Sequence, residues 1–256
     1  MPWDPNQYLK FAGHRLRPAI DLLSRIDLDD PAEIFDLGAG AGNVTRLLRA
    51  RWPNARITGV DGSAEMLDAA RAADPTIEWQ RADLAAWRPP RPADLIYSNA
   101  ALHWLDGHDA LFPALFERLA PGGALAVQMP RNFGAPSHTS ITRAVQSGPW
   151  RDALEPTLRP QPVEEPGFYF DLLTSRAASL DMWETEYLHV LEGEHPVKEW
   201  VKGTWLSPLL GSLEEPERSQ LEARYTELVA PAYPVRPDGR TLFPFRRLFI
   251  VATARG

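Results

Sequence analysis

The order of hydrophobic and polar positions divides the first half of the chain into two alternating kinds of segment. Short apolar runs suited to buried strands occupy residues 33–37, 56–60, 77–80, 94–98 and 123–129. Apolar residues recur at helical spacing within 44–51, 64–73 and 109–119. Strands that alternate with helices at this period predict an α/β fold, in which helices cover both faces of a parallel sheet.

The pattern changes after Met129. Five prolines fall within 149–167, and we expect an extended connector at 158–167 instead of a helix. Beyond it we expect a strand, two helices and a final strand, at 181–191, 196–210, 214–233 and 246–254. Because the final strand is strongly apolar, we expect it to join the same sheet, with 196–234 as an insertion and not an independent domain.

Composition narrows the class of protein. The net charge of −7 argues against broad binding to nucleic acids or anionic membranes. The chain has no cysteine, which excludes disulfides, thiolate zinc sites and cysteine nucleophiles. The first ten residues are polar and interrupted by proline, and no run of eighteen apolar residues occurs, so we expect a cytoplasmic protein.

A glycine-rich loop follows the first predicted strand. Gly38, Gly40 and Gly42 predict a tight turn at the carboxyl end of that strand, where α/β sheets bind ligands, although a plain strand-to-helix connection has the same pattern. About twenty residues later Asp61 ends the second strand, where its carboxylate can accept hydrogen bonds from both ribose hydroxyls. These features fit a nicotinamide dinucleotide and other nucleosides equally well.

Asp36, two residues before Gly38, distinguishes between these possible ligands by their charge. In a dinucleotide fold the pyrophosphate rests against the glycine loop, and a carboxylate beside it would be unfavourable. S-adenosylmethionine has no phosphate and carries an ammonium and a sulfonium group. The aspartate therefore favours a positively charged nucleoside.

Four segments together resemble the class I S-adenosylmethionine-dependent methyltransferases: "DLGAGAGN", "GVDGS", "RADL" and "LAPGGALAV". The resemblance implies a Rossmann-like sheet of seven strands, mostly parallel with the last antiparallel, and a helical lid insertion. It also implies site roles: Asp36 and Gly38 near the methionine moiety, Asp61 on the ribose, Asp83 on the adenine amine with Leu84 beside the ring, and Asn99 beside the transferable methyl. The remaining implied cofactor-binding residues are Gly40, Gly42, Gly62 and Met66.

Further segments resemble one group of these enzymes, the trans-aconitate 2-methyltransferases. They are "WDPNQYLKF", "ARWPNARITGVDGSAEML", "SNAALHWLDGHDALFPAL", "LAVQMPRN" and "RLFIVATA". The resemblance implies esterification of one carboxylate of a small tricarboxylic acid, with S-adenosylhomocysteine as by-product and no nucleic acid, membrane or obligate protein partner. The chain departs from close members at Arg131, where they have an acidic residue, and within 133–168, which leaves the preferred acid open.

Within this resemblance we expect a single domain. Its predicted parts are an N-terminal helical lid at 1–30, a cofactor-binding core at 31–130, acceptor-side insertions at 131–180 and 195–236, and closing strands at 181–191 and 246–254.

Methylation of a carboxylate requires the enzyme to position its substrates but not to activate the nucleophile. A carboxylate with a pKa of about 4 is already ionised at neutral pH, so no general base is needed. The enzyme must hold the carboxylate oxygen about 3 Å from the methyl group, an alignment worth roughly 7–11 kcal/mol. It must also bind the other carboxylates, for which arginine is the best side chain.

Candidate acceptor residues each have a plainer structural alternative. Arg131, Arg246 and Arg247 are candidate carboxylate clamps or solvated surface charges. His103 and Trp104 line the acceptor pocket or pack internally. Tyr8, Arg15 and Arg17 belong to a lid or to the outer face of a helix, and Tyr169 and Trp200 cap the acceptor or pack against the sheet.

Other functions stay open at this stage. His103, Asp106, His108 and Asp109 lie too close together along a turn to suggest a metal site. A methyltransferase for malonyl thioester on a carrier protein shares the motifs, but acidic residues outnumber basic ones in 196–234, which disfavours an acidic carrier. A nicotinamide-dependent oxidoreductase conflicts with Asp36, and a binding module without turnover is not excluded.

Overall fold

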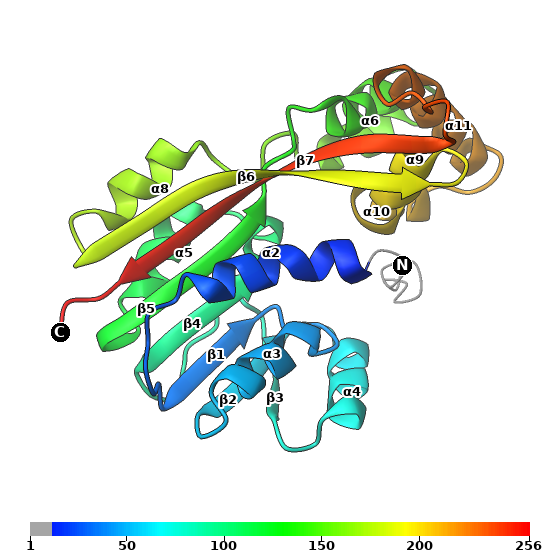
Figure 1. Cartoon of the computed structure of the whole chain (residues 1–256). Coiled ribbons are helices and arrows are strands. Elements are labelled where there is room, and N and C mark those ends of the chain that lie inside the picture. The colour runs from blue at the N-terminus through cyan, green and yellow to red at the C-terminus, as the bar shows by residue number, and fades with distance from the viewer. Residues whose placement is uncertain (1–11) are drawn as a thin grey trace. The chain divides into compact units, whose positions relative to one another are not determined.

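The computed structural model describes residues 12–256, and within them the strands form one seven-stranded sheet (Figure 1). The strands are β1 (Glu33–Leu37), β2 (Arg56–Asp61), β3 (Glu78–Arg81), β4 (Ala93–Asn99), β5 (Leu119–Pro130), β6 (Ser179–Glu192) and β7 (Arg240–Thr253). Their order is β3-β2-β1-β4-β5-β7-β6. Strands β1 to β5 pair in parallel and β7 runs antiparallel to β5, which confirms the predicted class I methyltransferase fold.

Helices connect the strands as the alternating pattern predicts. They are α2 (Ala12–Ser24), α3 (Asn43–Arg51), α4 (Ala64–Ala73), α5 (His108–Phe116), α6 (Pro136–Gln146), α7 (Arg151–Leu154), α8 (Pro166–Leu173), α9 (Pro196–Val201), α10 (Ser207–Gly211) and α11 (Glu217–Val229). Local chemistry sets some of their ends: the Ser63 side chain accepts a hydrogen bond from Met66 N and so caps α4. No helix within 12–256 combines the length and apolar character that crossing a membrane requires.

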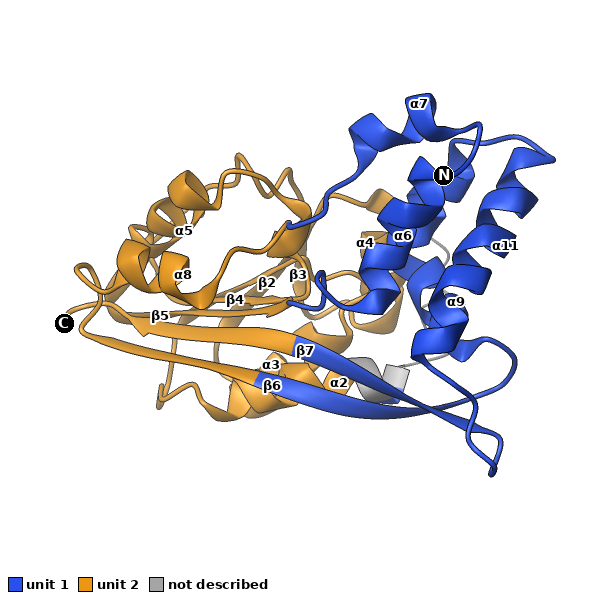
Figure 2. Cartoon of the chain, turned by 90° about the horizontal axis from the view of Figure 1, so that it is seen from above, with its two compact units in different colours: residues 1–15, 131–161, 185–246 blue, residues 16–130, 162–184, 247–256 orange. Residues whose placement is uncertain are grey.

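The chain divides into two compact units (Figure 2). Unit 2 comprises residues 16–130, 162–184 and 247–256, and holds β1 to β5, α3, α4, α5 and α8. Unit 1 comprises residues 12–15, 131–161 and 185–246 of the described chain. Strands β6 and β7 each contribute residues to both units.

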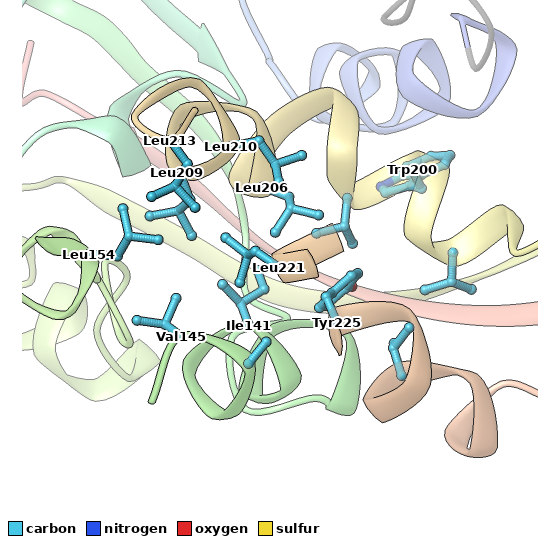
Figure 3. Close-up of a cluster of buried hydrophobic side chains, with 14 of the residues drawn as sticks. Ile141, Val145, Leu154, Trp200, Leu206, Leu209, Leu210, Leu213, Leu221 and Tyr225 are labelled. Atoms are coloured by element: carbon cyan, nitrogen blue, oxygen red, sulfur yellow. The ribbon is translucent and has the colours of Figure 1, made fainter. Parts of the chain in front are cut away.

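Each unit has its own apolar packing. In unit 2, β1 and β4 are buried along most of their length, as expected for the centre of a sheet covered on both faces. In unit 1, a cluster of buried side chains from α6, α9, α10 and α11 surrounds Leu221 and Tyr225, which are fully buried (Figure 3). The helices of 196–234, predicted as an insertion, therefore supply most of this second core.

Some predicted boundaries were wrong. The helix predicted at 109–119 ends at Phe116, and Leu119 already pairs with Ala93 in the sheet. The connector predicted at 158–167 contains the start of α8, because proline is well tolerated in the first turn of a helix. Helix α7 lies before this connector, and the Arg151–Glu155 ion pair at helical spacing stabilises it.

The closing strands are also longer than the apolar pattern indicated. Strand β7 begins at Arg240, so Arg246 and Arg247 lie in the middle of this strand and not at its start. Its first half alternates between buried and more exposed residues, as a strand with one covered face does, whereas its second half is buried throughout. Only the second half has the apolar run that the sequence pattern identifies.

Candidate active site

The glycine loop adopts a conformation that only glycine accepts readily. Gly38 and Gly42 have φ angles of 80° and 76°. A Cβ added at Gly38 would lie 2.1 Å from the Cβ of Ala101, and one added at Gly42 would lie 2.4 Å from the ring of Trp79. The backbone N–H groups of Gly38 and Ala39 both donate to Val60 O, at 2.8 and 3.1 Å, which ties the loop to the end of β2.

Asp61 holds this loop from the neighbouring strand. Its Oδ2 accepts a hydrogen bond from Gly40 N at 2.9 Å, and its Oδ1 accepts one from Ser63 N at 2.8 Å. A carboxylate oxygen has two lone-pair sites, so each oxygen retains the capacity to accept one more hydrogen bond. Asp61, which is predicted to bind the ribose, is thus also the residue that fixes the loop.

Asp36 lies buried at the carboxyl end of β1. The Thr45 hydroxyl, from the first turn of α3, donates to Asp36 Oδ2 at 2.6 Å. Burial raises the pKa of the Asp36 carboxyl to about 7, the Thr45 hydrogen bond opposes this rise, and the charge of Asp61 adds to it. Thr45 was not among the predicted residues, although a threonine in the first turn after a glycine loop is a natural partner for a carboxylate at the strand end.

Among the other predicted cofactor residues, Leu84 lies beside the glycine loop. Leu84 approaches Gly38, whose added Cβ would lie 3.9 Å from a Leu84 methyl group. Asp83 is exposed, and its Oδ1 accepts a hydrogen bond from Ala85 N at 3.0 Å. Met66 is buried in α4, and Gly62 follows Asp61 at the surface.

Polar side chains from three strands of unit 2, β1, β4 and β5, lie on one face of the sheet. Residues paired in register share a face, which places Asp36 with Tyr97 and Asn99 with Gln128. Tyr97 and Asn99 are two residues apart in β4, so both pairs share that face. Tyr97 donates its hydroxyl to Ala19 O of α2 at 2.8 Å, which identifies the face as the one that α2 covers.

Strand β7 adds a buried cation to this face. Phe249 pairs with Gln128, and Arg247 is two residues from Phe249, so Arg247 lies on the same side. Arg247 is only 5% exposed, and its guanidinium donates to Gln128 Oε1 at 3.4 Å. Arg247 was predicted as a carboxylate clamp, whereas Gln128 was not predicted, because a lone glutamine in an apolar strand gives no motif.

The backbone is strained at the end of β4, next to the polar side chains on this face of the sheet. Asn99 Oδ1 is buried and has no hydrogen-bond partner among residues 12–256. Ala100 has a φ of 54°, a left-handed conformation that costs a residue with a Cβ about 1–3 kcal/mol and that concentrates at functional sites. Its N–H donates to Gln128 O at 2.9 Å, so the strain serves to turn the chain sharply at the ligand-binding edge.

The two predicted positioning residues differ in exposure. His103 and Trp104 follow Asn99 in a short 3-10 helix, with ring centres 4.8 Å apart. His103 is buried, whereas Trp104 is 43% exposed. Only Trp104 thus presents a large surface beyond the packed interior.

His108 belongs to a buried hydrogen-bonded relay and not to a metal site. Its Nε2 donates to Leu102 O at 3.0 Å, so its Nδ1 accepts from the hydroxyl of Tyr169 at 2.7 Å. The Tyr169 hydroxyl also accepts from Glu164 N at 3.1 Å. Tyr169 is fully buried in this relay, which supports packing over capping of the acceptor. Within 12–256 no group of three or more acidic or histidine side chains is arranged to hold a metal ion.

The remaining candidates fall in unit 1, at Arg17 in unit 2, or outside the described residues. Arg131 is half-buried, its N–H donates to Arg246 O at 2.9 Å, and the Arg246 side chain is exposed. Trp200 is buried in the unit 1 core, stacked 4.7 Å from His189, so it packs as the plainer alternative predicted. Arg17 is exposed, and Tyr8 and the side chain of Arg15 lie outside what the structure describes.

Comparison with known proteins agrees with this geometry. Residues 34–123 match the family model of a methyltransferase domain. The fold resembles that of the YcgJ protein from Bacillus subtilis, with a TM-score of 0.62 and 14% identity, over 94% of this chain and 99% of that one. It also resembles phosphoethanolamine N-methyltransferase 2 from Haemonchus contortus in complex with S-adenosyl-L-methionine, with a TM-score of 0.54 and 14% identity, over 94% of this chain and 53% of that one.

Two curated relatives match along nearly their whole length. The trans-aconitate 2-methyltransferase of Azoarcus sp. is 49% identical over 98% of this chain and 98% of its own. That of Streptomyces avermitilis is 50% identical over 98% of this chain and 96% of its own. The chain therefore belongs to the trans-aconitate 2-methyltransferase family.

Proposed function

We propose that this protein is an S-adenosylmethionine-dependent carboxyl O-methyltransferase that converts trans-aconitate to a monomethyl ester. Relatives of that name at 49% and 50% identity support the substrate. The observation that carries the chemistry is the separation of charge on one sheet face of unit 2. Hydrogen-bond acceptors lie on β1 and β4, at Asp36 and Asn99, and a buried cation lies on β7, at Arg247.

The acceptor atoms fit a cationic methyl donor. Asp36 is a buried carboxyl whose ionised form a neighbouring ammonium or sulfonium group would stabilise. Asn99 Oδ1 is an acceptor without a partner among residues 12–256, and we assign it to the methionine end of the donor. We assign Asp61 to the ribose, and Asp83, with Leu84 and Met66, to the adenine side. Gly38, Gly40, Gly42 and Gly62 shape the backbone around it.

Arg247 fits the anionic acceptor. Arg247 is a buried cation near the ligand-binding edge of the sheet, and a planar guanidinium is well suited to bind a carboxylate of the proposed acid. S-adenosylmethionine supplies the electrophilic methyl group, and the acceptor carboxylate is ionised without help from the protein. The chain's residues thus have to orient the acid and exclude water, and we assign positioning roles to His103 and Trp104.

The finer assignments follow from this proposal. Arg131 and Arg246 are further candidates for the distal carboxylates, Tyr8 for closure over the ligands, and Tyr169 for positioning through His108. A small polycarboxylate is the proposed partner, with no nucleic acid, membrane or obligate protein partner, and the cytoplasm is the proposed location.

A carrier-protein methyltransferase is the less favoured alternative. Recognition of an acidic carrier needs free surface cations. In unit 1, Lys198 pairs with Glu199 at 2.6 Å, and Lys198 and Lys202 both donate to Glu222, at 3.0 and 2.7 Å, so two carboxylates balance the two ammonium groups.

Methyl transfer to a panel of acids tests the proposal. The panel is trans-aconitate, cis-aconitate, citrate, isocitrate and a malonyl thioester, with labelled S-adenosylmethionine and base-lability of the product as the sign of an ester. We expect a base-labile product from trans-aconitate well above the others. If the protein binds S-adenosylmethionine but methylates none of the acids, the acceptor proposal is wrong and the fold assignment stands.

A further inference from the structure

The orientation of the Gln128 amide is fixed by its neighbour. A guanidinium group has only hydrogen-bond donors, so the Gln128 atom that faces Arg247 must be the amide oxygen. This is the observed contact, from Arg247 to Gln128 Oε1 at 3.4 Å. The amide nitrogen of Gln128 therefore points elsewhere with both of its N–H donors.

That nitrogen is buried without a partner. Gln128 is fully buried, and its Nε2 has no hydrogen-bond acceptor among residues 12–256. The buried hydroxyls of the adjacent strand β4 are satisfied, since Ser98 donates to Leu37 O and Tyr97 donates to Ala19 O, each at 2.8 Å. Buried polar groups in folded proteins almost always have a partner, so an unsatisfied donor at this edge of the sheet indicates a ligand atom that accepts.

The neutrality of the Gln128 side chain is as informative as its geometry. A glutamate at this position would reach Arg247 equally well, but it would neutralise the guanidinium by forming an ion pair. Glutamine accepts a hydrogen bond from Arg247 and adds no negative charge of its own. A neutral residue that orients a buried cation and adds a donor of its own is complementary to a carboxylate.

We infer that Gln128 binds the acceptor acid. Its Nε2 donates a hydrogen bond to a carboxylate oxygen of the acid, while its Oε1 orients Arg247. This inference rests on the proposed function, because it takes the anionic acceptor from there. It separates the two ligands: the methyl donor contacts the acceptors of β1 and β4, and the acid contacts the donors of β5 and β7.

Two substitutions separate the effect of the Gln128 N–H donor from the effect of the Arg247 charge. Gln128→Met keeps the length of the side chain and removes both the donor and the contact to Arg247. Gln128→Glu keeps the contact and cancels the charge of Arg247. Thr241→Val in β7 is the matched control, since Thr241 Oγ1 is another buried atom without a partner among residues 12–256, and it lies in unit 1.

The measurements are steady-state kinetics for trans-aconitate and calorimetric affinity for S-adenosylmethionine. We expect the KM for the acid to rise about 10–100-fold in Gln128→Met, as for loss of hydrogen bonds to a charged group, and more steeply in Gln128→Glu. Affinity for S-adenosylmethionine should stay within about twofold of wild type, and Thr241→Val should change neither value.

A purely structural role for Gln128 gives a different result. In that case Gln128→Met lowers thermal stability or leaves it unchanged while the KM for the acid stays at its wild-type value, and the inference is overturned. The wild-type protein tests the proposed function separately. If it methylates no acid, calorimetric binding of each acid to wild type and to Gln128→Glu decides the inference, and equal affinities, or no binding of any acid, overturn it.

Discussion

At the scale of single residues, Asp36 has two opposing influences on its charge. Burial favours the neutral acid, whereas the Thr45 hydroxyl stabilises the carboxylate. The resulting pKa of about 7 places the change of charge inside the physiological range. A cationic ligand binds the ionised form better, so binding and ionisation of Asp36 are coupled.

We therefore predict that affinity for S-adenosylmethionine increases as the pH rises from 6 to 8, in excess of any change seen in Asp36→Asn. Calorimetry at several pH values measures this. Thr45→Val removes the hydrogen bond that lowers the pKa of Asp36. In this variant the midpoint of the pH dependence of affinity should therefore move to higher pH. Identical pH profiles in wild type and Asp36→Asn would contradict the coupling.

The same pKa predicts a change in stability with the opposite sign. Because the folded-state pKa of about 7 exceeds the ordinary aspartate pKa of 3.8, the contribution of Asp36 to stability is present below about pH 4 and lost as the pH rises through 7. At about 1.4 kcal/mol per pKa unit, Asp36→Asn should make the ligand-free protein up to about 4 kcal/mol more stable at pH 8 and little changed at pH 4. Denaturant unfolding at the two pH values checks this.

At the scale of elements, the glycine loop illustrates how neighbouring strands define a turn. Gly38 and Gly40 both have positive φ, but an added Cβ meets Ala101 at Gly38 and open space at Gly40. The two positions thus differ in steric crowding while sharing backbone strain.

We predict that Gly38→Ala weakens S-adenosylmethionine binding more than Gly40→Ala does. Gly40→Ala costs about 1 kcal/mol of backbone strain, and Gly38→Ala adds a clash with Ala101 that must displace the loop. Affinity by calorimetry and unfolding midpoints measure both effects. Partial rescue of Gly38→Ala by Ala101→Gly is expected, and equal losses at the two glycines would show that crowding is unimportant.

The relay from Leu102 through His108 to Tyr169 is the second element with a testable role. We predict that Tyr169→Phe destabilises the protein by about 1–3 kcal/mol, because it leaves His108 Nδ1 and Glu164 N without their hydrogen-bond partner. The KM for the acid should change little, since Tyr169 is fully buried. A large rise in KM with unchanged stability would instead assign Tyr169 to the acceptor.

The elements that the sequence predicted well are those with strong local signals. Strands β1 and β2 are short, buried runs, and Gly38 marks the turn after β1, so their positions followed from the pattern. The early start of β5 at Leu119 did not, because its pairing with Ala93 is a long-range contact that overrides helical spacing. Thr45 and Gln128 were missed for a similar reason: each owes its place to a partner on another element, Asp36 or Arg247.

At the scale of the whole molecule, the described residues with proposed contacts to the methyl donor all lie in unit 2. Unit 1 has a separate core, centred on Leu221 and Tyr225, to which none of those residues belongs. Stability and cofactor affinity should therefore respond differently to changes in the two units, although β6 and β7 run through both.

Two fully buried leucines provide a matched comparison. Leu221→Ala in α11 and Leu48→Ala in α3 should each lower the free energy of unfolding by about 2–5 kcal/mol. Leu48 is on the helix that carries Thr45, so its loss should also weaken S-adenosylmethionine binding, whereas Leu221→Ala should leave that affinity unchanged. Denaturant unfolding and calorimetry, the latter well below the melting temperature, separate the two quantities. An equal loss of affinity in both variants would show that unit 1 contributes to the methyl-donor site, and the assignment of that site to unit 2 alone would be wrong.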